Sequence, residues 1–480
     1  MKYEKIISIP CLIKAKEKKG ITAPIYANIS ISEEKRIANK NKKYLIKTYG
    51  CQANVRDSET LAGLLEIANF QETNNEKEAD IIIINTCAVR ENAEDKVFGE
   101  IGNLKALRSK EKRKIFALCG CMAEEPDIVE KVRKIFPHIN LIFGTHEIPH
   151  FLDYVDELFT KDVSHIISVK SQAGEIFENL PEKRQDAYKA FVNIMYGCDK
   201  FCTYCIVPFT RGRERSRLEV DVLKECKKII ALGYQEITLL GQNVNAYGKD
   251  LKDGTSFAGL LEKVAQLGIP RLRFTTSHPW DFSDELIDVI AKYPNIMKAI
   301  HLPFQSGNDE ILKKMGRRYS SQDYLNLVDR MKSRIPGLTL STDIIVGFPN
   351  ETYEQFLDTL KLIDYVKFDF AFTFIYSPRL GTPAAKLKDD ITDEEKHRRF
   401  NELVKHLEKY VEQSGEKMVG NIFDVLVEGP SKNNKEMFSG YTENNKLVHF
   451  KSDESKIGKI IKVKILESRT YSFLGETLDG

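Results

Sequence analysis

Short aliphatic runs alternate with amphipathic stretches over the first third of the chain. Residues 44–48, 80–86, 114–118 and 140–143 are rich in Ile, Leu and Val and predict strands. The segments between them, such as SETLAGLLEIANF and EPDIVEKVRKIF, place apolar residues at helical spacing. This alternation predicts an α/β fold over residues 44–160, with a doubly wound parallel sheet.

A second alternating pattern runs from residue 185 to residue 414. Helical patterns separate six candidate strands, which lie at 191–195, 235–240, 271–275, 298–302, 338–346 and 369–376. Six consecutive βα units predict a partial (β/α)6 barrel of the TIM type. Polar clusters such as GQNVN, SHPW and QSG follow the strands, where barrel enzymes place their chemistry. The same residue types also form ordinary turns.

The final segment, residues 415–480, alternates in β fashion. Gly and Asn turns separate five short strands, FDVLVEG, MFSGYT, KLVHF, KIIKVKILE and YSFLGE. They predict a small β-barrel of a kind that often binds oligonucleotides. Residues 146–190 predict a linker with one helix. Its opening string, HEIPH, matches a zinc-protease motif, but Pro149 would break the helix that this motif requires.

Composition and charge favour a globular cytoplasmic enzyme without a membrane partner. The chain has 480 residues, of which 42% are hydrophobic, and its formal net charge is +2. The longest aliphatic run, 81–84, is far shorter than the ~18 apolar residues of a membrane helix. Residues 1–43 carry an excess of Lys and Arg and form a basic N-terminal extension, either a solvated tail or a contact for phosphate groups.

Three of the nine cysteines lie close together in one loop. The odd number of cysteines argues against a disulfide framework. Cys198, Cys202 and Cys205 form a C-x-x-x-C-x-x-C string with no second hook nearby for a four-ligand zinc site. Three thiolates in one loop suit a [4Fe-4S] cluster that has one iron open to a small molecule.

Three further cysteines each follow a predicted strand. Cys51, Cys87 and Cys121 are separated by about one βαβ unit each. Because parallel strands end at one edge of a sheet, we expect these thiols to form a second three-thiolate cluster site. Scattered buried cysteines are the alternative. Cys119, next to Cys121, and Cys226, on an apolar helical face, are expected in the core.

Four arginines follow the cysteine loop within seven residues. This density predicts binding of phosphate or carboxylate groups, with a solvated charge run as the alternative. The residues are Arg211, Arg213, Arg215 and Arg217.

The string GCDKFCTYCIVP, followed by RGRERSR, resembles the radical S-adenosylmethionine (SAM) methylthiotransferases. TYGCQANVRDSE, INTCAVRENAEDKVFG and CGCMAEEP resemble the N-terminal domain of that family. TLLGQNVNAYG, LPFQSGNDEILKKMGRRY and STDIIVGFPNET resemble its barrel, and SGYTENNKLVHF resembles its C-terminal TRAM domain. The resemblance covers roughly residues 43–478. Cys119 and Lys200 depart from the family's strings.

The resemblance implies two [4Fe-4S] clusters and SAM as cofactors. Cys198, Cys202 and Cys205 would bind the cluster that chelates SAM, and Cys51, Cys87 and Cys121 would bind an auxiliary cluster that delivers sulfur. A 5′-deoxyadenosyl radical would abstract hydrogen from C2 of N6-dimethylallyladenosine beside the tRNA anticodon. From their positions, the candidate SAM contacts are Gln242, Asn243, Gln305 and Asp343. The candidate RNA contacts are the four arginines.

The implied partners are tRNA carrying a prenylated adenosine, an electron donor of the flavodoxin or ferredoxin type, and an iron–sulfur or sulfur donor; the protein is expected to be a monomer. Two other members of the family remain alternatives, one acting on threonylcarbamoyladenosine in tRNA and one on an aspartate of a ribosomal protein. A non-catalytic iron–sulfur electron carrier or RNA-binding module is a further alternative. The six-unit barrel with polar loops argues against it.

Overall fold

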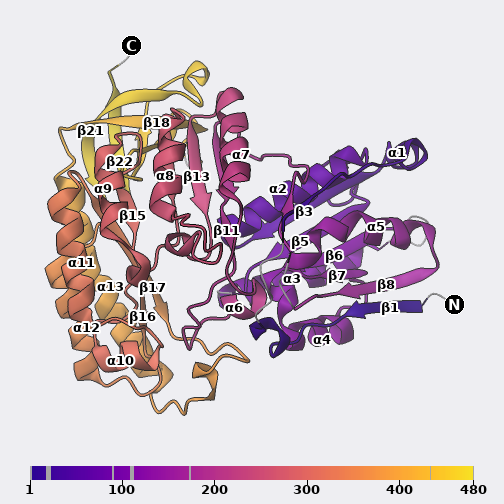
Figure 1. Ribbon diagram of the computed structural model, residues 1–480, viewed down its shortest axis with the longest axis horizontal. Helices are drawn as coiled ribbons and strands as arrows, with labels where there is room; N and C mark the ends of the chain where they lie inside the picture. The colour runs from indigo at the N-terminus through magenta and orange to yellow at the C-terminus, as the bar shows by residue number, and fades with distance from the viewer. Residues whose placement is uncertain are drawn as a thin grey trace. The chain divides into compact units, whose positions relative to one another are not determined.

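The computed structural model describes residues 3–17, 23–88, 91–108, 113–171, 175–432 and 434–478. The chain divides into two compact units (Figure 1). Unit 1 comprises residues 1–185, 193–201 and 205–221, and unit 2 comprises residues 186–192, 202–204 and 222–480. The cysteine loop (residues 198–205) therefore contributes residues to both units.

Unit 1 is built on a seven-stranded sheet whose order is β1-β8-β7-β6-β5-β3-β4 (Figure 1). All of its strand pairs are parallel, as the doubly wound fold predicts. Each of the four predicted strands of this domain is present. The strands are β1 (Tyr3–Ser8), β3 (Lys43–Tyr49), β4 (Gln71–Glu72), β5 (Ile81–Thr86), β6 (Ile115–Gly120), β7 (Leu141–Phe143) and β8 (Val163–Ser168).

Alternate side chains of the central strands enter different cores. Ile81 and Ile83 of β5 belong to one apolar cluster, and Ile82 and Ile84 belong to another. Helices α2 (Gln52–Ile67) and α5 (Phe151–Thr160) pack in the first cluster, whereas α3 (Glu91–Leu104) and α4 (Pro126–Ile135) pack in the second. Cys119 lies in the first cluster, and Cys226, on α7 (Glu219–Ala231), is also buried, as predicted.

The predicted basic extension and linker both contribute to the sheet. β1, from the extension, pairs with β8, which lies in the predicted linker. Lys5 pairs with Glu157 at 2.7 Å and Arg133 pairs with Glu4 at 2.9 Å, so charged side chains help to fix this edge strand. The remaining elements of unit 1 are η1 (Lys14–Lys16), β2 (Ile25–Tyr26), α1 (Glu33–Asn39), η2 (Lys105–Leu107), η3 (Cys121–Glu124), η4 (Thr145–His150), β9 (Phe177–Glu178), β11 (Met195–Tyr196), α6 (Val207–Thr210) and β12 (Arg215–Ser216).

All six predicted barrel strands are present. They form two three-stranded sheets, β10-β13-β14 and β15-β16-β17. The β13–β14, β15–β16 and β16–β17 pairs are parallel, and an isolated parallel bridge joins Leu272 to Ile296. The strands are β10 (Lys189–Asn193), β13 (Glu236–Leu240), β14 (Arg271–Phe274), β15 (Ala299–His301), β16 (Thr339–Val346) and β17 (Phe370–Ile375). The helices are α7 (Glu219–Ala231), α8 (Phe257–Gln266), α9 (Asp284–Lys292), α10 (Asp309–Lys314), α11 (Ser321–Arg334), α12 (Tyr353–Val366) and α13 (Asp393–Glu416).

The C-terminal strands close into a five-stranded barrel, as predicted from their alternation. Its order is β18-β19-β20-β22-β21. The strands are β18 (Ile422–Pro430), β19 (Phe438–Thr442), β20 (Leu447–Phe450), β21 (Ile460–Arg469) and β22 (Ser472–Thr477). Within unit 2, the side chain of Arg271 on β14 is buried and donates to the carbonyls of Tyr441 at 2.8 Å and Asp424 at 2.5 Å. In the part of the chain that the structure covers, no helix combines the length and the apolar character needed to cross a bilayer.

Candidate cluster sites and nucleotide-binding loops

The cysteines of unit 1 lie where three neighbouring parallel strands end in register. Tyr49 of β3 pairs with Thr86 of β5, and Thr86 pairs with Gly120 of β6. Cys87 and Cys121 follow these residues directly, and Cys51 follows Tyr49 by two positions. The predicted gathering of three thiols at one sheet edge is therefore present, and we call it the three-thiol edge.

Two glycines make this edge possible. Gly50 has φ 147° and Gly120 has φ 90°, a backbone region that favours glycine. A Cβ on Gly50 would lie 2.6 Å from the Cβ of Cys87, and one on Gly120 would lie 2.3 Å from the Thr86 carbonyl oxygen. The close approach of the strand ends therefore depends on the absence of a side chain at both positions.

Arg211 places a positive charge at the three-thiol edge. Its Nε donates to Cys121 Sγ at 3.1 Å, and its Nη2 lies 2.7 Å from Asp57 Oδ2. A hydrogen bond with the Cys87 side chain and the charge of Arg211 lower the pKa of Cys51 to about 5. Burial raises the pKa of Cys121, and Arg211 opposes that rise. The edge thus favours at least one thiolate.

The chemistry of this edge fits a cluster better than a single ion. Among the residues described, no three His, Cys, Asp or Glu side chains converge closely enough to hold one metal ion. An iron–sulfur cluster places its own iron and sulfide atoms between the thiolates, so its ligands stand farther apart than those of a single ion. Three thiols with a buried arginine fit such a group.

The cysteine loop carries the second set of thiols. Within unit 2, Arg317 lies against Cys202, with Nη1 at 3.7 Å from Sγ, and its Nη2 donates to the Pro303 carbonyl at 2.7 Å. The Thr203 amide donates to the Met315 carbonyl at 2.9 Å, which fixes this part of the loop. Within unit 1, the Cys198 amide donates to the Gly212 carbonyl at 3.1 Å.

Buried polar atoms without a hydrogen-bond partner gather after the barrel strands. One follows each of β13, β14, β15 and β17: Asn245 Nδ2, Ser277 Oγ, Gln305 Oε1 and Tyr376 OH. Buried polar groups are normally paired, so such a group marks a place where a polar ligand can bind. The four atoms therefore suit a ligand that carries several donors and acceptors.

The four predicted SAM residues are placed in different ways. Gln305 is buried with φ 71°, and it contributes one of these atoms. Asn243 is buried and its Nδ2 donates to Asp281 Oδ2 at 2.8 Å. Asp343, on β16, lies 3.4 Å from His301 Nε2, and Gln242 is half-buried after β13. All four remain candidates.

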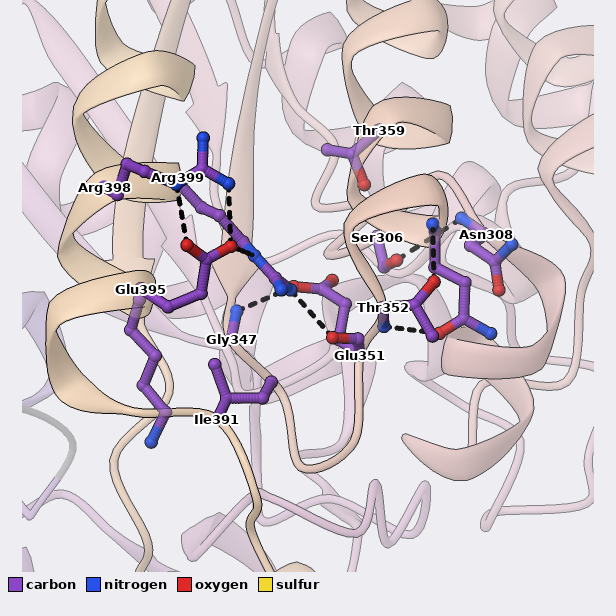
Figure 2. A network of polar contacts seen from close by, with 12 residues as sticks. Ser306, Asn308, Gly347, Glu351, Thr352, Thr359, Ile391, Glu395, Arg398 and Arg399 are labelled. Atoms are coloured by element: carbon purple, nitrogen blue, oxygen red, sulfur yellow. Dashed lines mark hydrogen bonds and ion pairs between the residues drawn. The ribbon is translucent and has the colours of Figure 1, made fainter.

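A buried polar network supports the loop that follows β16 (Figure 2). Glu351 Oε2 accepts the Gly347 amide at 2.8 Å, and the Glu351 carbonyl accepts Arg399 Nη1 at 2.7 Å. Arg399 in turn donates through Nε to Glu395 of α13 at 2.6 Å. Burial raises the pKa of Glu351 to about 7. These residues hold the loop rather than project into a ligand site.

The four predicted RNA-binding arginines are less exposed than expected. Arg211 and Arg217 are buried, and Arg217 makes a two-pronged contact with Glu178 at 2.7 and 2.6 Å. Arg213 pairs with Asp199, and Arg215 lies over the Tyr196 ring. This placement favours structural roles for Arg211 and Arg217. The contact with RNA remains a prediction.

Trp280 is an exposed aromatic residue at the end of the SHPW cluster, which the sequence placed after a barrel strand without predicting a role for the tryptophan. It is the only tryptophan of the chain, is 48% exposed, and follows β14. The Arg318 guanidinium lies 6.0 Å from the centre of its ring. A cavity of about 310 Å³, lined also by Lys249 and Tyr247, adjoins it. The signal available from the sequence was the single tryptophan of the chain, which lies in the loop after a predicted barrel strand.

Comparisons with known proteins agree with these observations. Family models match the chain as Radical SAM superfamily over residues 192–363, as uncharacterized protein family UPF0004 over residues 43–144, and as TRAM domain over residues 416–478. The tRNA-2-methylthio-N(6)-dimethylallyladenosine synthase of Staphylococcus epidermidis is 49% identical over 475 residues, covering 98% of this chain and 92% of the relative. The protein of the same description from Oceanobacillus iheyensis is 50% identical over 473 residues, with coverages of 98% and 91%.

A solved structure resembles the chain in its fold. A radical S-adenosylmethionine methyltransferase of Kitasatospora setae, with a tryptophan substrate and a SAM analogue bound, aligns with a TM-score of 0.51 at 15% identity. The alignment covers 72% of this chain and 75% of that one.

Proposed function

Because the chain belongs to the radical SAM methylthiotransferase family of the tRNA-2-methylthio-N(6)-dimethylallyladenosine synthases, we propose that it adds a methylthio group to C2 of N6-dimethylallyladenosine in tRNA. The observation that carries this proposal is identity of about half the residues over 98% of the chain. The three-thiol edge and the cysteine loop, both required by such chemistry, support it.

The proposal assigns one cofactor set to each group of cysteines. Cys198, Cys202 and Cys205 hold the [4Fe-4S] cluster of the radical SAM domain, and Cys51, Cys87 and Cys121 hold an auxiliary [4Fe-4S] cluster. When bound, SAM and the clusters supply a 5′-deoxyadenosyl radical and the sulfur. The C2–H bond of adenine is not acidic, so side-chain acids and bases do not suffice and the cofactors carry the difficult step.

The barrel residues bind and orient SAM in this proposal. Gln305, Ser277, Asn245 and Tyr376 each offer a donor or acceptor atom that has no hydrogen-bond partner among the residues described. Their burial keeps water from the radical, and they pair with the polar groups of SAM instead. The network around Glu351 keeps the loop after β16 in place, because the Gly347 amide and the guanidinium of Arg399 on α13 both donate to Glu351.

The tRNA contacts are assigned to unit 2. The target base must leave the anticodon-loop stack to reach the chemistry, and an exposed aromatic face stabilises an unstacked base. Trp280, with Arg318 over its ring, offers such a face, and the C-terminal barrel is of the TRAM family. These residues provide stacking and positive charge without sequence readout.

The proposed reaction needs partners besides tRNA. SAM cleavage requires an electron from a donor of the flavodoxin or ferredoxin type, and repeated turnover requires an iron–sulfur or sulfur donor. We propose that the protein acts as a monomer in the cytoplasm, where its tRNA substrate is used.

Nucleoside mass spectrometry tests the proposed reaction. Anaerobically reconstituted, reduced protein is incubated with SAM and tRNA that carries either dimethylallyladenosine or threonylcarbamoyladenosine. We expect a methylthio mass gain only on the prenylated nucleoside. Gain only on the threonylcarbamoylated nucleoside, or on neither while SAM is cleaved, contradicts the proposal, the second outcome pointing to a protein substrate.

Iron content tests the assignment of two clusters. The variant Cys198→Ala/Cys202→Ala/Cys205→Ala and the variant Cys51→Ala/Cys87→Ala/Cys121→Ala should each bind about four iron ions per chain, against about eight in the wild type. A variant that binds the full complement, or none, contradicts the assignment of its cysteines. Cys119→Ala, which removes a core cysteine, is the matched control and should retain both clusters.

A further inference from the structure

Arg211 lies in the interior of unit 1, although its position in an arginine-rich string suggests a surface residue. It caps the C-terminal end of α6 and is 5% exposed. Its Nε donates to Cys121 Sγ at 3.1 Å, and its Nη2 lies 2.7 Å from Asp57 Oδ2. Asp57 belongs to α2, the helix that begins directly after Cys51. One guanidinium therefore contacts two of the elements that form the three-thiol edge.

Packing of the surrounding segment fixes the position of Arg211. Ile206 and Phe209 lie in one apolar cluster with Ala88 and Cys121. The Thr145 hydroxyl donates to the Thr210 carbonyl at 3.1 Å, and the Arg211 amide donates to the Val207 carbonyl at 2.8 Å. Apolar contacts and backbone hydrogen bonds thus place the guanidinium beside the thiols, and these contacts do not depend on its charge.

We propose that Arg211 is a positioning residue for the auxiliary cluster. Its guanidinium holds the Cys121 sulfur and stabilises the reduced form of the cluster. The proposal rests on the proposed function, which assigns this cluster to the three thiols. Hydrogen bonds to cysteine sulfurs and the local charge set the reduction potential of such clusters. Reduction adds one negative charge, which a buried guanidinium stabilises more than a solvated one does.

The positive charge of Arg211 also affects the proposed sulfur transfer. A carbon radical contributes one electron and a sulfur lone pair contributes two, whereas the new C–S bond holds two. As the bond that held this sulfur to the cluster broke, the auxiliary cluster would take up the third electron. Arg211 would favour this uptake, because its guanidinium lies beside the Sγ of Cys121, one of the three thiols that would hold the cluster. Asp57 has the opposite effect, since its carboxylate offsets part of the positive charge.

A redox titration monitored by electron paramagnetic resonance tests the proposal. The full-length variant Cys198→Ala/Cys202→Ala/Cys205→Ala carries only the auxiliary cluster, so its signal reports this site alone. Added to that background, Arg211→Gln should decrease the ratio of reduced to oxidised cluster at a fixed potential at least tenfold, which is a shift of about 59 mV. Asp57→Asn should shift the ratio in the opposite direction, because it leaves the guanidinium uncompensated.

The control is Arg213→Gln, which removes an arginine of the same string whose guanidinium pairs with Asp199 in unit 1. An Arg211→Gln titration that coincides with this control, or an Asp57→Asn ratio that is unchanged or lowered, overturns the inference. If Arg211→Gln binds no iron, the Asp57→Asn arm still decides, because it retains Arg211. Absence of iron from the background variant itself contradicts the auxiliary cluster of the proposed function instead, so the two failures are distinguishable.

Discussion

Replacing Arg271 by methionine tests whether a buried arginine attaches the C-terminal barrel to the rest of unit 2. Arg271 is 2% exposed, and burial lowers its pKa to about 10. It donates to two backbone carbonyls of the C-terminal barrel, those of Tyr441 and Asp424. Glu236, its acidic neighbour at 3.9 Å, keeps a closer partner in Arg273 at 2.9 Å. The substitution therefore removes the donor from two carbonyl groups but leaves no carboxylate without a partner.

The magnitude follows from these contacts. A hydrogen bond from a charged donor contributes about 1.5–3 kcal/mol, so two contribute about 3–6 kcal/mol. Methionine fills much of the vacated volume and recovers part of this in apolar contacts. We expect a net loss of about 3 kcal/mol in the free energy that keeps the barrel attached, which is on the order of a 100-fold change in its opening equilibrium.

Hydrogen exchange measures this local opening. The amides of β18 and β19, which contain Asp424 and Tyr441, should exchange on the order of 100-fold faster in Arg271→Met. Lys292→Met is the control, because Lys292 pairs with Glu262 at 2.8 Å on the surface, where an ion pair contributes below about 1 kcal/mol. Equal exchange of these strands in the two variants would refute the attachment.

Three further predictions concern other parts of the chain. Trp280→Ala should raise the KM for tRNA about tenfold while Trp280→Phe raises it less, because a stacked base contributes about 1–3 kcal/mol; steady-state kinetics that show equal KM values contradict this. The folded protein holds the Glu351 proton more tightly than the unfolded chain, so stability should fall as pH rises from about 4.5 to about 7. The urea midpoint should fall less over this pH range in Glu351→Gln than in the wild type, and an equal fall in the two proteins argues against this prediction. Gly63→Ala should lower the melting temperature of unit 1, because the new Cβ would meet the Glu182 amide nitrogen at 2.4 Å, whereas Gly99→Ala enters open space on α3 and should raise it; calorimetry that finds the same sign for both contradicts this reasoning.

The central strands of both α/β regions were predictable because their periodicity is simple. The run at β5 is fully buried on both faces, so it contains four consecutive isoleucines and is easily found. β1 and β8 were missed for the opposite reason. β1 has two adjacent charged residues, Glu4 and Lys5, followed by two adjacent isoleucines, so it lacks the alternation of a strand. Its stability comes from partners more than a hundred residues away. An edge strand of this kind carries little local signal.

The cysteines of the three-thiol edge were predictable from topology alone. Each follows an aliphatic strand, and parallel strands bring their ends to one edge regardless of the loop sequences. The unpaired atoms of Ser277, Asn245 and Tyr376 were not predictable as individual contacts. Turn formation explains Ser and Asn equally well from sequence, and only the fold shows that each side chain has a buried polar atom with no hydrogen-bond partner among the described residues.

The arginine string shows why residue type alone misleads at a site of this kind. Four arginines within seven residues predict a surface for phosphate, yet Arg211 and Arg217 are buried against Asp57 and Glu178. Asp57 lies 154 positions before Arg211 in the chain, so no local sequence pattern could predict this ion pair. A loss of activity in either arginine variant would therefore be misread as a loss of tRNA binding. Because a buried ion pair that loses one partner leaves an uncompensated charge, such a variant disturbs unit 1 first. Contributions of this string to tRNA binding are separable only where the variant keeps its iron and its fold, and Arg213, which is partly exposed, is the position at which that separation is feasible.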